Sequence, residues 1–466
     1  MKARGSLVAL LALAGCTTVG PNYRLPDKAA ANLPHAQGAF DSGQGKGFSQ
    51  AALPDHWWQL YGDARLDGYV AEALAANADL RAADANLRKA DAVVKEVAAG
   101  RSLTTDLSAG VSVARPYGTG ASLPGAVGYN LGVALAYPLD LSGKIRRAIE
   151  ASQADAEQVA AARDDVRVTI AAETARAYAA ACSANLTLAA NTRILKLQNQ
   201  TLDVTQRLQR GGRGTAFDVT RARTAVNQNE ALIPGILATR TAALYKLATL
   251  MGRAPADYPK DAVGCTAPPT MAKAMPIGDG AALIRRRPDL RADERALAAA
   301  TARIGGAMAD LYPQVSLGAS AGFEGPTSNF SAAKAFNLAL GPLVSWSFPN
   351  RPVVRAQIEQ AGAAADAALA TFDSGVLEAL RQTETALSAY ARERERNAAL
   401  TRAWASAATA ADQASKLYRF GRTDFLTLLT SQASLATAEA NLAASNATLI
   451  DYQVSVFLAL GGGWQS

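Results

Sequence analysis

The chain has 466 residues, which is enough for two or three ordinary domains. Hydrophobic residues make up 49% but aromatic residues only 6%, because much of the apolar content is alanine, which favours helices and buries little surface. This composition predicts long, thinly packed helices and not one thick core. The formal charge of +7 is interspersed along the chain with no basic stripe, which argues against a nucleic-acid-binding protein.

The N-terminus has the pattern of a lipoprotein signal peptide. A short basic start precedes an apolar run over residues 6–14, too short to span a bilayer as a helix. The run ends in Leu-Ala-Gly-Cys, which resembles the bacterial lipobox. We expect residues 1–15 to be removed and Cys16 to carry several acyl chains, palmitate among them, which together anchor durably. The alternative is an ordinary signal peptide followed by a chance cysteine.

Residues suited to catalysis or metal binding are scarce. Beyond Cys16 only Cys182 and Cys265 remain, and the two histidines are His35 and His56. A zinc site or a Cys–His nucleophile needs more partners than these, and we find no P-loop, nucleotide motif or pair of catalytic carboxylates. We expect no enzyme, no metal and no cofactor. The helical context of Cys182 favours a buried small hydrophobic side chain, with a disulfide to Cys265 as the alternative in an oxidising compartment.

The chain repeats itself. Four short motifs recur at an offset of 209 or 210 residues: Asp-Leu-Arg-Ala from residue 79 at 289, Leu-Ser-Ala from 107 as Leu-Gly-Ala at 317, Leu-Gln-Arg-Gly-Gly-Arg from 208 as Leu-Tyr-Arg-Phe-Gly-Arg at 417, and Leu-Met-Gly from 250 as Ala-Leu-Gly at 459. Chance similarity between alanine-rich helices would not align the glycines and arginines. The sequence therefore predicts two copies of one unit, at residues 57–252 and 279–466.

We expect the same order of elements in each copy. A first helix covers about 63–99 and 279–308, two extended segments follow, and a very long helix covers about 145–209 and 353–419. A glycine-containing turn leads to a last helix that ends near Met251 and Leu460. About 65 helical residues span ~100 Å, whereas a compact chain of this length has a radius of gyration of only ~23 Å, so the long helices must lie side by side in an elongated assembly.

Two segments between these elements are rich in proline, glycine and small residues. They are the N-terminal linker and anchor at 16–56 and the linker at 253–278. We expect both to wrap the outside of the helices.

Four segments alternate apolar with small polar residues, as tilted outer-membrane strands do: 103–114, 129–139, 314–323 and 336–348. The polar positions are mostly Gly, Ser, Ala and Asn, which suits a water-filled lumen, whereas a soluble sandwich would present Lys, Glu and Thr. Pro342 indicates a bulge or an edge strand. We expect two hairpins whose loops, at 115–128 and 324–335, face outward, with interfacial aromatics near strand ends: Tyr129, Tyr137, Trp346 and Phe348.

Four strands cannot close a barrel, and open sheet edges do not persist in lipid. Two copies would give an eight-stranded barrel filled by its own side chains, whereas three copies give twelve strands, the smallest multiple with a channel. The sequence therefore predicts an α+β membrane protein that forms a homotrimer, in which a twelve-stranded β-barrel continues into a long α-helical barrel.

Several motifs resemble those of TolC-like outer-membrane efflux proteins, closest to the NodT-type lipoproteins that serve RND pumps. They are Gly-Pro-Asn-Tyr from residue 20, Trp-Trp-Gln-Leu-Tyr-Gly-Asp from 57, Arg-Arg-Pro-Asp-Leu-Arg from 286, Ala-Arg-Ile-Gly from 302 and Gly-Pro-Leu-Val-Ser-Trp from 341. Tyr61 stands where that family usually has phenylalanine. The resemblance covers essentially the whole mature chain.

The resemblance implies a trimeric, lipid-anchored duct in the outer membrane that extends into the periplasm and is shut at its periplasmic tip. Such a duct passively exports drugs or other small toxic compounds and so contributes to multidrug resistance. Its partners would be a periplasmic adaptor, an inner-membrane RND transporter and outer-membrane lipid. A duct for type I protein secretion and a periplasmic coiled-coil scaffold are the alternatives.

The resemblance also implies a gate after the glycine turn of the second copy. Leu426 and Thr430 match a leucine and an aspartate four residues later, so that Thr430 departs from the pattern and leaves the gate to a hydrophobic ring of Leu426. Charged residues nearby, or at related places of the first copy, have solvated helix ends as their alternative role: Arg422, Asp424, Arg213 and Asp218.

The turns themselves are implied to contact the adaptor. They centre on Gly212 and Gly421 and are flanked by Arg210 and Arg419. Glycine at such a place also has a local reason, because it adopts positive φ at a helix end without strain.

Overall fold

The computed structural model describes residues 18–45, 47–114, 126–271, 273–327, 335–346, 348 and 351–463. It divides into two compact units, each assembled from distant parts of the chain. The described residues of unit 1 come from 18–27, 86–160 and 292–372, and those of unit 2 from 28–85, 161–291 and 373–463. The expected signal peptide and Cys16 lie outside the described residues.

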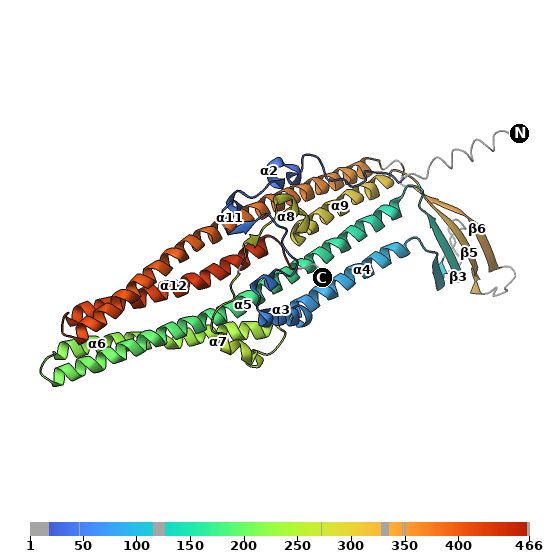
Figure 1. Ribbon diagram of the computed structural model, residues 1–466. Coiled ribbons are helices and arrows are strands. Elements are labelled where there is room, and N and C mark those ends of the chain that lie inside the picture. The colour runs from blue at the N-terminus through green and yellow to red at the C-terminus, as the bar shows by residue number, and fades with distance from the viewer. Residues whose placement is uncertain are drawn as a thin grey trace. The chain divides into compact units, whose positions relative to one another are not determined.

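The same order of elements occurs twice along the chain (Figure 1). The first series is α3 (Ala64–Ala76), α4 (Ala78–Ala99), β2 (Thr104–Ala114), β3 (Ala126–Leu139), α5 (Lys144–Arg210), α6 (Ala216–Glu230) and α7 (Ile233–Leu250). The second is α8 (Gly280–Arg286), α9 (Pro288–Ala309), β5 (Gln314–Pro326), β6 (Phe336–Ser345), α11 (Arg351–Arg419) and α12 (Phe425–Ala459). The two very long helices have 67 and 69 residues. No helix in the described ranges carries an apolar stretch long enough to cross a bilayer.

The first helix of each series is broken, although the sequence predicts a continuous one. α3 ends before Asn77, whose Oδ1 accepts hydrogen bonds from the backbone N–H groups of Asp79 (2.8 Å) and Leu80 (3.2 Å) and so caps α4. α8 ends before Arg287, because Pro288 disfavours helical backbone at the residue that precedes it. Both breaks fall at the same place in their series, 210 residues apart.

The last helix is broken in the first series but continuous in the second. α6 ends at Glu230 and α7 begins at Ile233, with Pro234 in its first turn, where a backbone N–H is not needed. α12 contains no proline and runs for 35 residues without interruption.

Unit 1 contains a four-stranded antiparallel sheet in the order β2-β3-β5-β6 (Figure 1). The two expected hairpins are present, and pairing of β3 with β5 joins them. Strands β3 and β5 extend three residues further toward the expected loops than the sequence predicts, and β6 ends at Ser345 instead of 348. Pro342 pairs with Leu317 in an unbroken register on an edge strand, so it marks an edge and not a bulge.

The two linkers meet in unit 2. β1 (Phe48–Ser49) pairs in parallel with β4 (Met275–Pro276). Trp57, which follows the first linker, is fully buried, and its ring stacks on Phe457 of α12 with centroids 4.5 Å apart. Backbone pairing therefore ties the N-terminal linker to the second linker, and buried aromatic packing ties the residue that follows it to α12.

A disulfide joins Cys182 of α5 to Cys265 of the second linker, with Cα atoms 5.1 Å apart and a sequence separation of 83. The sequence favours a buried small hydrophobic side chain at Cys182, with a disulfide as the alternative. The structure shows the disulfide. Asn185, one helical turn further along α5, donates from Nδ2 to the carbonyl oxygens of Val263 and Cys265 at 2.9 Å each. The linker is fixed to α5 by both contacts.

Candidate functional site: a two-faced sheet and two helical turns

The register of the sheet gathers the apolar residues of all four strands on one face. Directly paired residues of antiparallel strands point to the same side, and Leu107 pairs with Val133, Leu131 with Phe323, and Ala321 with Leu338. The leucines and the valine of this set are exposed, to 74% at Leu107, while Ala321 and Phe323 are half-buried. Leu340, on the same face, is 84% exposed. The chain by itself therefore presents a continuous apolar sheet face that nothing within the described residues covers.

The opposite face consists mostly of small or polar residues. One row across the four strands runs Ser108, Gly132, Gly322 and Asn337. Leu343 is the exception on this side: it pairs with Ser316 and leans over Gly318, where an added Cβ would lie 2.6 Å from Leu343 Cδ1. The alternation in the sequence thus corresponds to two chemically distinct faces.

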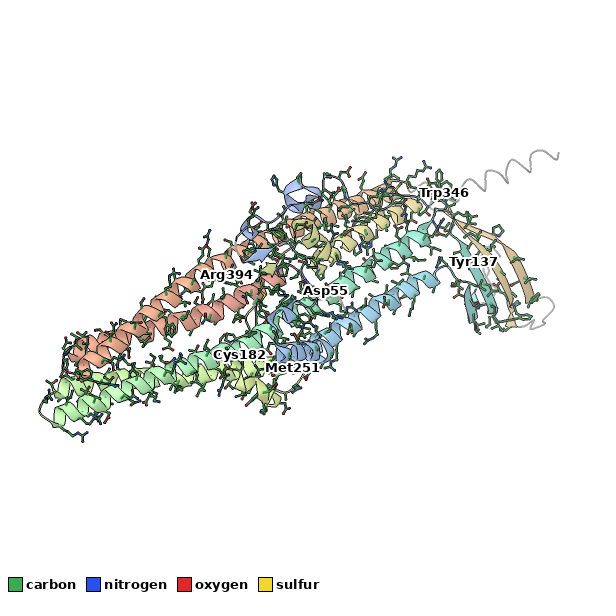
Figure 2. All side chains as sticks on the ribbon, viewed as in Figure 1. Asp55, Tyr137, Cys182, Met251, Trp346 and Arg394 are labelled. Carbon is green, nitrogen blue, oxygen red and sulfur yellow. A yellow bond between two sulfur atoms is a disulfide. The ribbon has the colours of Figure 1, made fainter. Side chains whose placement is uncertain are left out.

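Aromatic residues gather at the end of the sheet that leads into the helices. Tyr137 lies two residues before the end of β3, and Trp346 directly follows β6, as Figure 2 shows. Phe348 contacts Trp346, with ring centroids 5.1 Å apart. Tyr312, which the sequence analysis missed, lies two residues before β5, and all four side chains are exposed. The predicted Tyr129 lies near the other end of β3, opposite Gly325.

In unit 2, glycine turns connect α5 to α6 and α11 to α12. Gly212 and Gly421 have φ of 71° and 68°, in the left-handed region that glycine adopts without strain. The residue after each glycine closes the turn in the same way, because the N–H groups of Arg213 and Arg422 donate to Leu208 and Leu417 carbonyls at 2.9 Å. Arg210 and Arg419 are the last residues of α5 and α11.

The two acidic residues predicted near the gate cap helices. Thr215 and Asp218 form a capping box at the start of α6, in which Asp218 Oδ2 accepts from the Thr215 N–H at 3.2 Å. Asp424 caps α12 and accepts from the backbone N–H (2.8 Å) and the hydroxyl (2.9 Å) of Thr427. The backbone hydrogen bond from Thr427 is the main reason that the pKa of Asp424 is lowered. Both acids therefore have a local structural role.

The predicted gate residues lie in the first two turns of α12. Leu426 is 49% exposed, and the Thr430 hydroxyl donates to the Leu426 carbonyl oxygen at 2.9 Å, so it is engaged within its own helix. Two aromatic residues at the turns escaped the sequence analysis: Phe217 is 67% exposed and Phe420 is 79% exposed. Phe217 is the second residue of α6 as Leu426 is of α12, so the 209-residue offset would have found it.

Polar contacts join α5 to α12 along the approach to the turns. Gln432 Nε2 donates to Thr201 Oγ1 at 2.8 Å, and Arg193 pairs with Glu439 at 2.5 Å. Gln432 is almost fully buried, and its Oε1 has no hydrogen-bond partner among the described residues. A seam with an unsatisfied buried oxygen is held less firmly than an apolar one of the same size.

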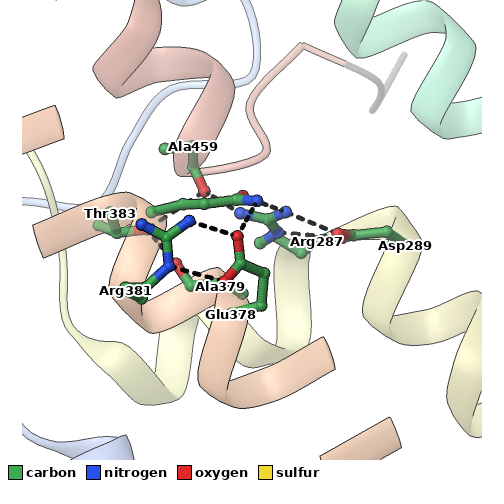
Figure 3. A network of polar contacts seen from close by, with 8 residues as sticks. Arg287, Asp289, Glu378, Ala379, Arg381, Thr383 and Ala459 are labelled. Carbon is green, nitrogen blue, oxygen red and sulfur yellow. Dashed lines mark hydrogen bonds and ion pairs between the residues drawn. The ribbon is translucent and has the colours of Figure 1, made fainter. Parts of the chain in front are cut away.

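The Arg-Arg-Pro-Asp motif ties three elements together (Figure 3). Arg287 forms a two-bond pair with Asp289 at 3.0 and 2.6 Å and donates from Nη1 to the carbonyl oxygen of Ala459, the last residue of α12, at 2.9 Å. It also donates to Gln382 of α11 at 3.1 Å. The motif therefore supplies a charged donor to a helix-terminal carbonyl oxygen that also accepts from the Thr383 hydroxyl at 3.3 Å.

Comparison with known proteins gives one consistent result. The model of the family described as "Outer membrane efflux protein" matches residues 69–253 and 281–462. Nodulation protein T of Rhizobium leguminosarum bv. trifolii is 27% identical over 463 residues, which cover 97% of this chain and 96% of that protein. The toluene efflux pump outer membrane protein TtgI of Pseudomonas putida is 29% identical over 483 residues, covering 98% and 97%.

Solved structures agree with these relatives. The outer-membrane channel OprN superposes with a TM-score of 0.88 at 36% identity, covering 97% of this chain and all of that one. The open-state MtrE channel of Neisseria gonorrhoeae has the same fold, with a TM-score of 0.82 at 23% identity over 96% of this chain and 99% of that one. The resemblance drawn from the motifs is confirmed: the chain belongs to the outer membrane efflux protein family.

Proposed function

We propose that this chain is one third of a trimeric outer-membrane duct through which an efflux pump expels small toxic compounds. One observation carries the proposal: a four-stranded sheet has one continuous apolar face, one face of small polar residues, and two open edges, β2 and β6. In water such a face would cause aggregation, and in lipid such edges would leave backbone groups without partners.

Closure with other copies removes both problems. Three sheets joined edge to edge make twelve strands, with the apolar face toward lipid and the small polar face toward an open lumen. The order of elements, which occurs twice, supports an origin from two internal repeats at 57–252 and 279–466. The loops between the paired strands would then face the exterior, while the long helices would continue the duct into the periplasm.

Membership of the family supports the proposed anchor and partners. Cys16 would carry the acyl chains that hold the mature chain in the outer membrane. A periplasmic adaptor and an inner-membrane RND transporter would deliver the cargo, and relatives named as toluene and solvent efflux pump components support small apolar compounds as its class. The duct itself would do no chemistry.

The turns of unit 2 are the proposed gate and docking surface. Leu426 would supply the hydrophobic constriction, with Thr430 behind it and Arg422 and Arg213 nearby. Asp424 and Asp218 would act mainly through their helix caps. The adaptor would contact the turns at Gly212 and Gly421, between Arg210 and Arg419, and the exposed rings of Phe217 and Phe420 offer the apolar area that such a contact needs.

The gate assignment is tested by Leu426→Ala combined with Arg422→Ala. Loss of the apolar ring and of the neighbouring charge should raise single-channel conductance in planar bilayers and make cells sensitive to vancomycin, which is normally too large to enter. Leu417→Ala combined with Lys416→Ala, an exposed leucine and an exposed cation in the last turn of α11, is the matched control and should leave both unchanged. Unaltered conductance and vancomycin sensitivity in the Leu426 variant would contradict the assignment.

A further inference from the structure

The first described residues of the chain lie in a fitted seat within unit 1. We call residues 18–23 the strap and Ser142, Gly143, Arg147 and Gly305 the seat. The backbone N–H of Val19 donates to the Ser142 carbonyl oxygen at 3.1 Å. Gly20 has φ of +89°, and a Cβ there would lie 2.4 Å from the Cα of Gly305. A Cβ on Gly143 would likewise lie 2.9 Å from the Cα of Thr18, so only glycines permit this approach.

Arg147 of α5 holds the strap by its polar groups. Its guanidinium donates from Nε to Val19 O (3.0 Å) and from Nη2 to Gly20 O (3.0 Å) and Asn22 Oδ1 (2.9 Å). A fourth bond goes to Glu150 at 2.7 Å. Arg147 is only 2% exposed, and a buried guanidinium deprived of acceptors is strongly unfavourable. The seat is therefore built to be occupied.

Tyr23 fixes the far end of the strap. Its hydroxyl donates to Glu294 of α9 at 3.2 Å, and its ring packs on a buried cluster of Ala154, Ala298 and Ala299. The guanidinium of Arg295 lies 5.6 Å from the centre of the ring, close enough for a cation–π contact. The Gly-Pro-Asn-Tyr motif thus has a physical role at each of three residues.

The seat lies beside the end of the sheet that carries the aromatic residues. Ser142 is three residues past the end of β3 at Leu139, and Tyr137 and Tyr312 are exposed at the same end. In membrane β-barrels such residues lie at the level of the lipid headgroups. Cys16 is two residues before Thr18, and covalent geometry keeps its Cα within about 7 Å of that of Thr18.

We propose that the seat is an anchor dock, which holds the chain next to the acylated Cys16 at the headgroup level of the periplasmic leaflet. The lipid anchor is then held in a fixed place on the chain, so that the acyl chains and the barrel strands enter the leaflet at the same depth. Arg147 is the residue that positions the strap. The inference rests on the proposed function, because it takes the sheet as membrane-spanning and Cys16 as acylated.

Tryptic cleavage of the full-length, acylated protein in proteoliposomes tests whether the seat is occupied. The peptide bond after Arg24 follows the strap, and cleavage there releases the acylated peptide, which mass spectrometry measures. Gly20→Val should expel the strap and speed cleavage about tenfold or more, because cleavage requires local opening. Gly45→Val, at a linker glycine with no atom within 4 Å of an added Cβ, is the matched control and should be cleaved as slowly as the wild type.

Depth is measured with a fluorophore on Pro21→Cys and, separately, on Tyr312→Cys, quenched by lipids that carry nitroxides at known depths. The two labels should report depths equal within about 5 Å, the thickness of one headgroup layer. With Gly20→Val added, the Pro21→Cys label should lose this depth while the Tyr312→Cys label keeps it. A merely structural contact within the strap would not produce this split.

The outcomes separate the two proposals. Wild-type protein that forms no trimer and conducts no current contradicts the proposed function. A conducting trimer in which wild type and Gly20→Val are cleaved equally fast, or in which the Pro21→Cys label lies in water, contradicts the anchor dock alone.

Discussion

Two different side chains, at equivalent positions of the two series, each donate a hydrogen bond to the last carbonyl group of a helix. Asn77 donates from Nδ2 to the carbonyl oxygen of Leu250, the last residue of α7, at 2.9 Å, while Arg287 donates to that of Ala459, the last residue of α12, at 2.9 Å. The donors are 210 residues apart and the acceptors 209. If the two series descend from one duplicated unit, as proposed, the contact to the helix end has been kept while the side chain that makes it has changed.

Arg287 should matter to stability far more than its neighbour Arg381. Arg287→Met removes bonds to Asp289, Gln382 and Ala459, and hydrogen bonds to a charged group contribute about 2 kcal/mol to the free energy of unfolding. Arg381 forms an exposed pair with Glu378 one turn away, so Arg381→Met should change little. Thermal unfolding followed by circular dichroism compares the two. Equal losses would contradict the role given to the Ala459 carbonyl.

Substitutions of Asp424 can distinguish a role as a helix cap from a role as a negative charge at the gate. Asparagine caps helices as well as aspartate, whereas alanine does not. Asp424→Asn should therefore leave hydrogen exchange of residues 425–430 slow, and Asp424→Ala should speed it. A loss of protection in Asp424→Asn equal to that in the alanine variant would show that the negative charge, and not the cap, is what matters.

The same cap predicts a pH dependence. The pKa of Asp424 is lowered in the folded chain, chiefly by the backbone N–H of Thr427. The extra stabilisation that the charged form adds to the cap is then complete at neutral pH and is lost as the pH falls through this depressed pKa, below the ordinary carboxylate range, although the neutral side chain still accepts a hydrogen bond as asparagine does. The protection factors of 425–430 in the wild type, which are corrected for the intrinsic pH dependence of exchange, should fall modestly and only in that acidic window, and a fall near pH 6 would contradict the assignment.

At the scale of elements, the disulfide holds the second linker to α5. It closes a loop of 83 residues, which on the chain-entropy model stabilises the folded state by about 4.5 kcal/mol. Cys182→Ala with Cys265→Ala should therefore lower the unfolding temperature markedly and increase exchange in residues 260–276. Because both cysteines are buried, mild reductant should leave the folded wild type unaffected. A double variant as stable as the wild type would contradict this account.

The sequence predicts elements that depend on local patterns, and it does not predict features that depend on contacts between distant residues. The alternation at 103–114 and 314–323 is local and fixes which residues share a face, so both strands and both hairpins follow from it. Pairing of β3 with β5 is not encoded in any turn, since about 170 residues separate the two strands. The break at Asn77 was missed because helix-favouring alanines surround it, and the contacts of that side chain decide the outcome.

Part of the candidate site could be predicted from the sequence and part could not. The 209-residue offset locates Phe217 once Leu426 is known, and the positions of Tyr137 and Trp346 near strand ends predict part of the aromatic end of the sheet. The contacts of the strap could not be predicted from the sequence. Its acceptors are more than 120 residues from Arg147 along the chain, and a glycine motif alone does not identify the surface that it approaches. Family resemblance indicates that Gly20 matters, and the contact with Gly305 explains why.

At the scale of the whole molecule, the decisive feature is that the sheet is incomplete in one chain. An exposed apolar face and two unpaired edges are together unstable in water and in lipid, and a closed barrel of several copies satisfies both. Long helices then need no membrane-spanning character of their own. In the proposed barrel, an open lumen with small polar walls would allow passive export and would leave selectivity to the pump.

The central claim is tested most directly by cysteine accessibility in intact outer membranes. Ser108→Cys and Ser320→Cys lie on the small polar face, and Leu107→Cys and Leu338→Cys lie on the apolar face. The account predicts that a membrane-impermeant thiol reagent modifies the first pair through the lumen and leaves the second pair unmodified in lipid. Equal modification of both pairs would place the sheet in water and contradict the account.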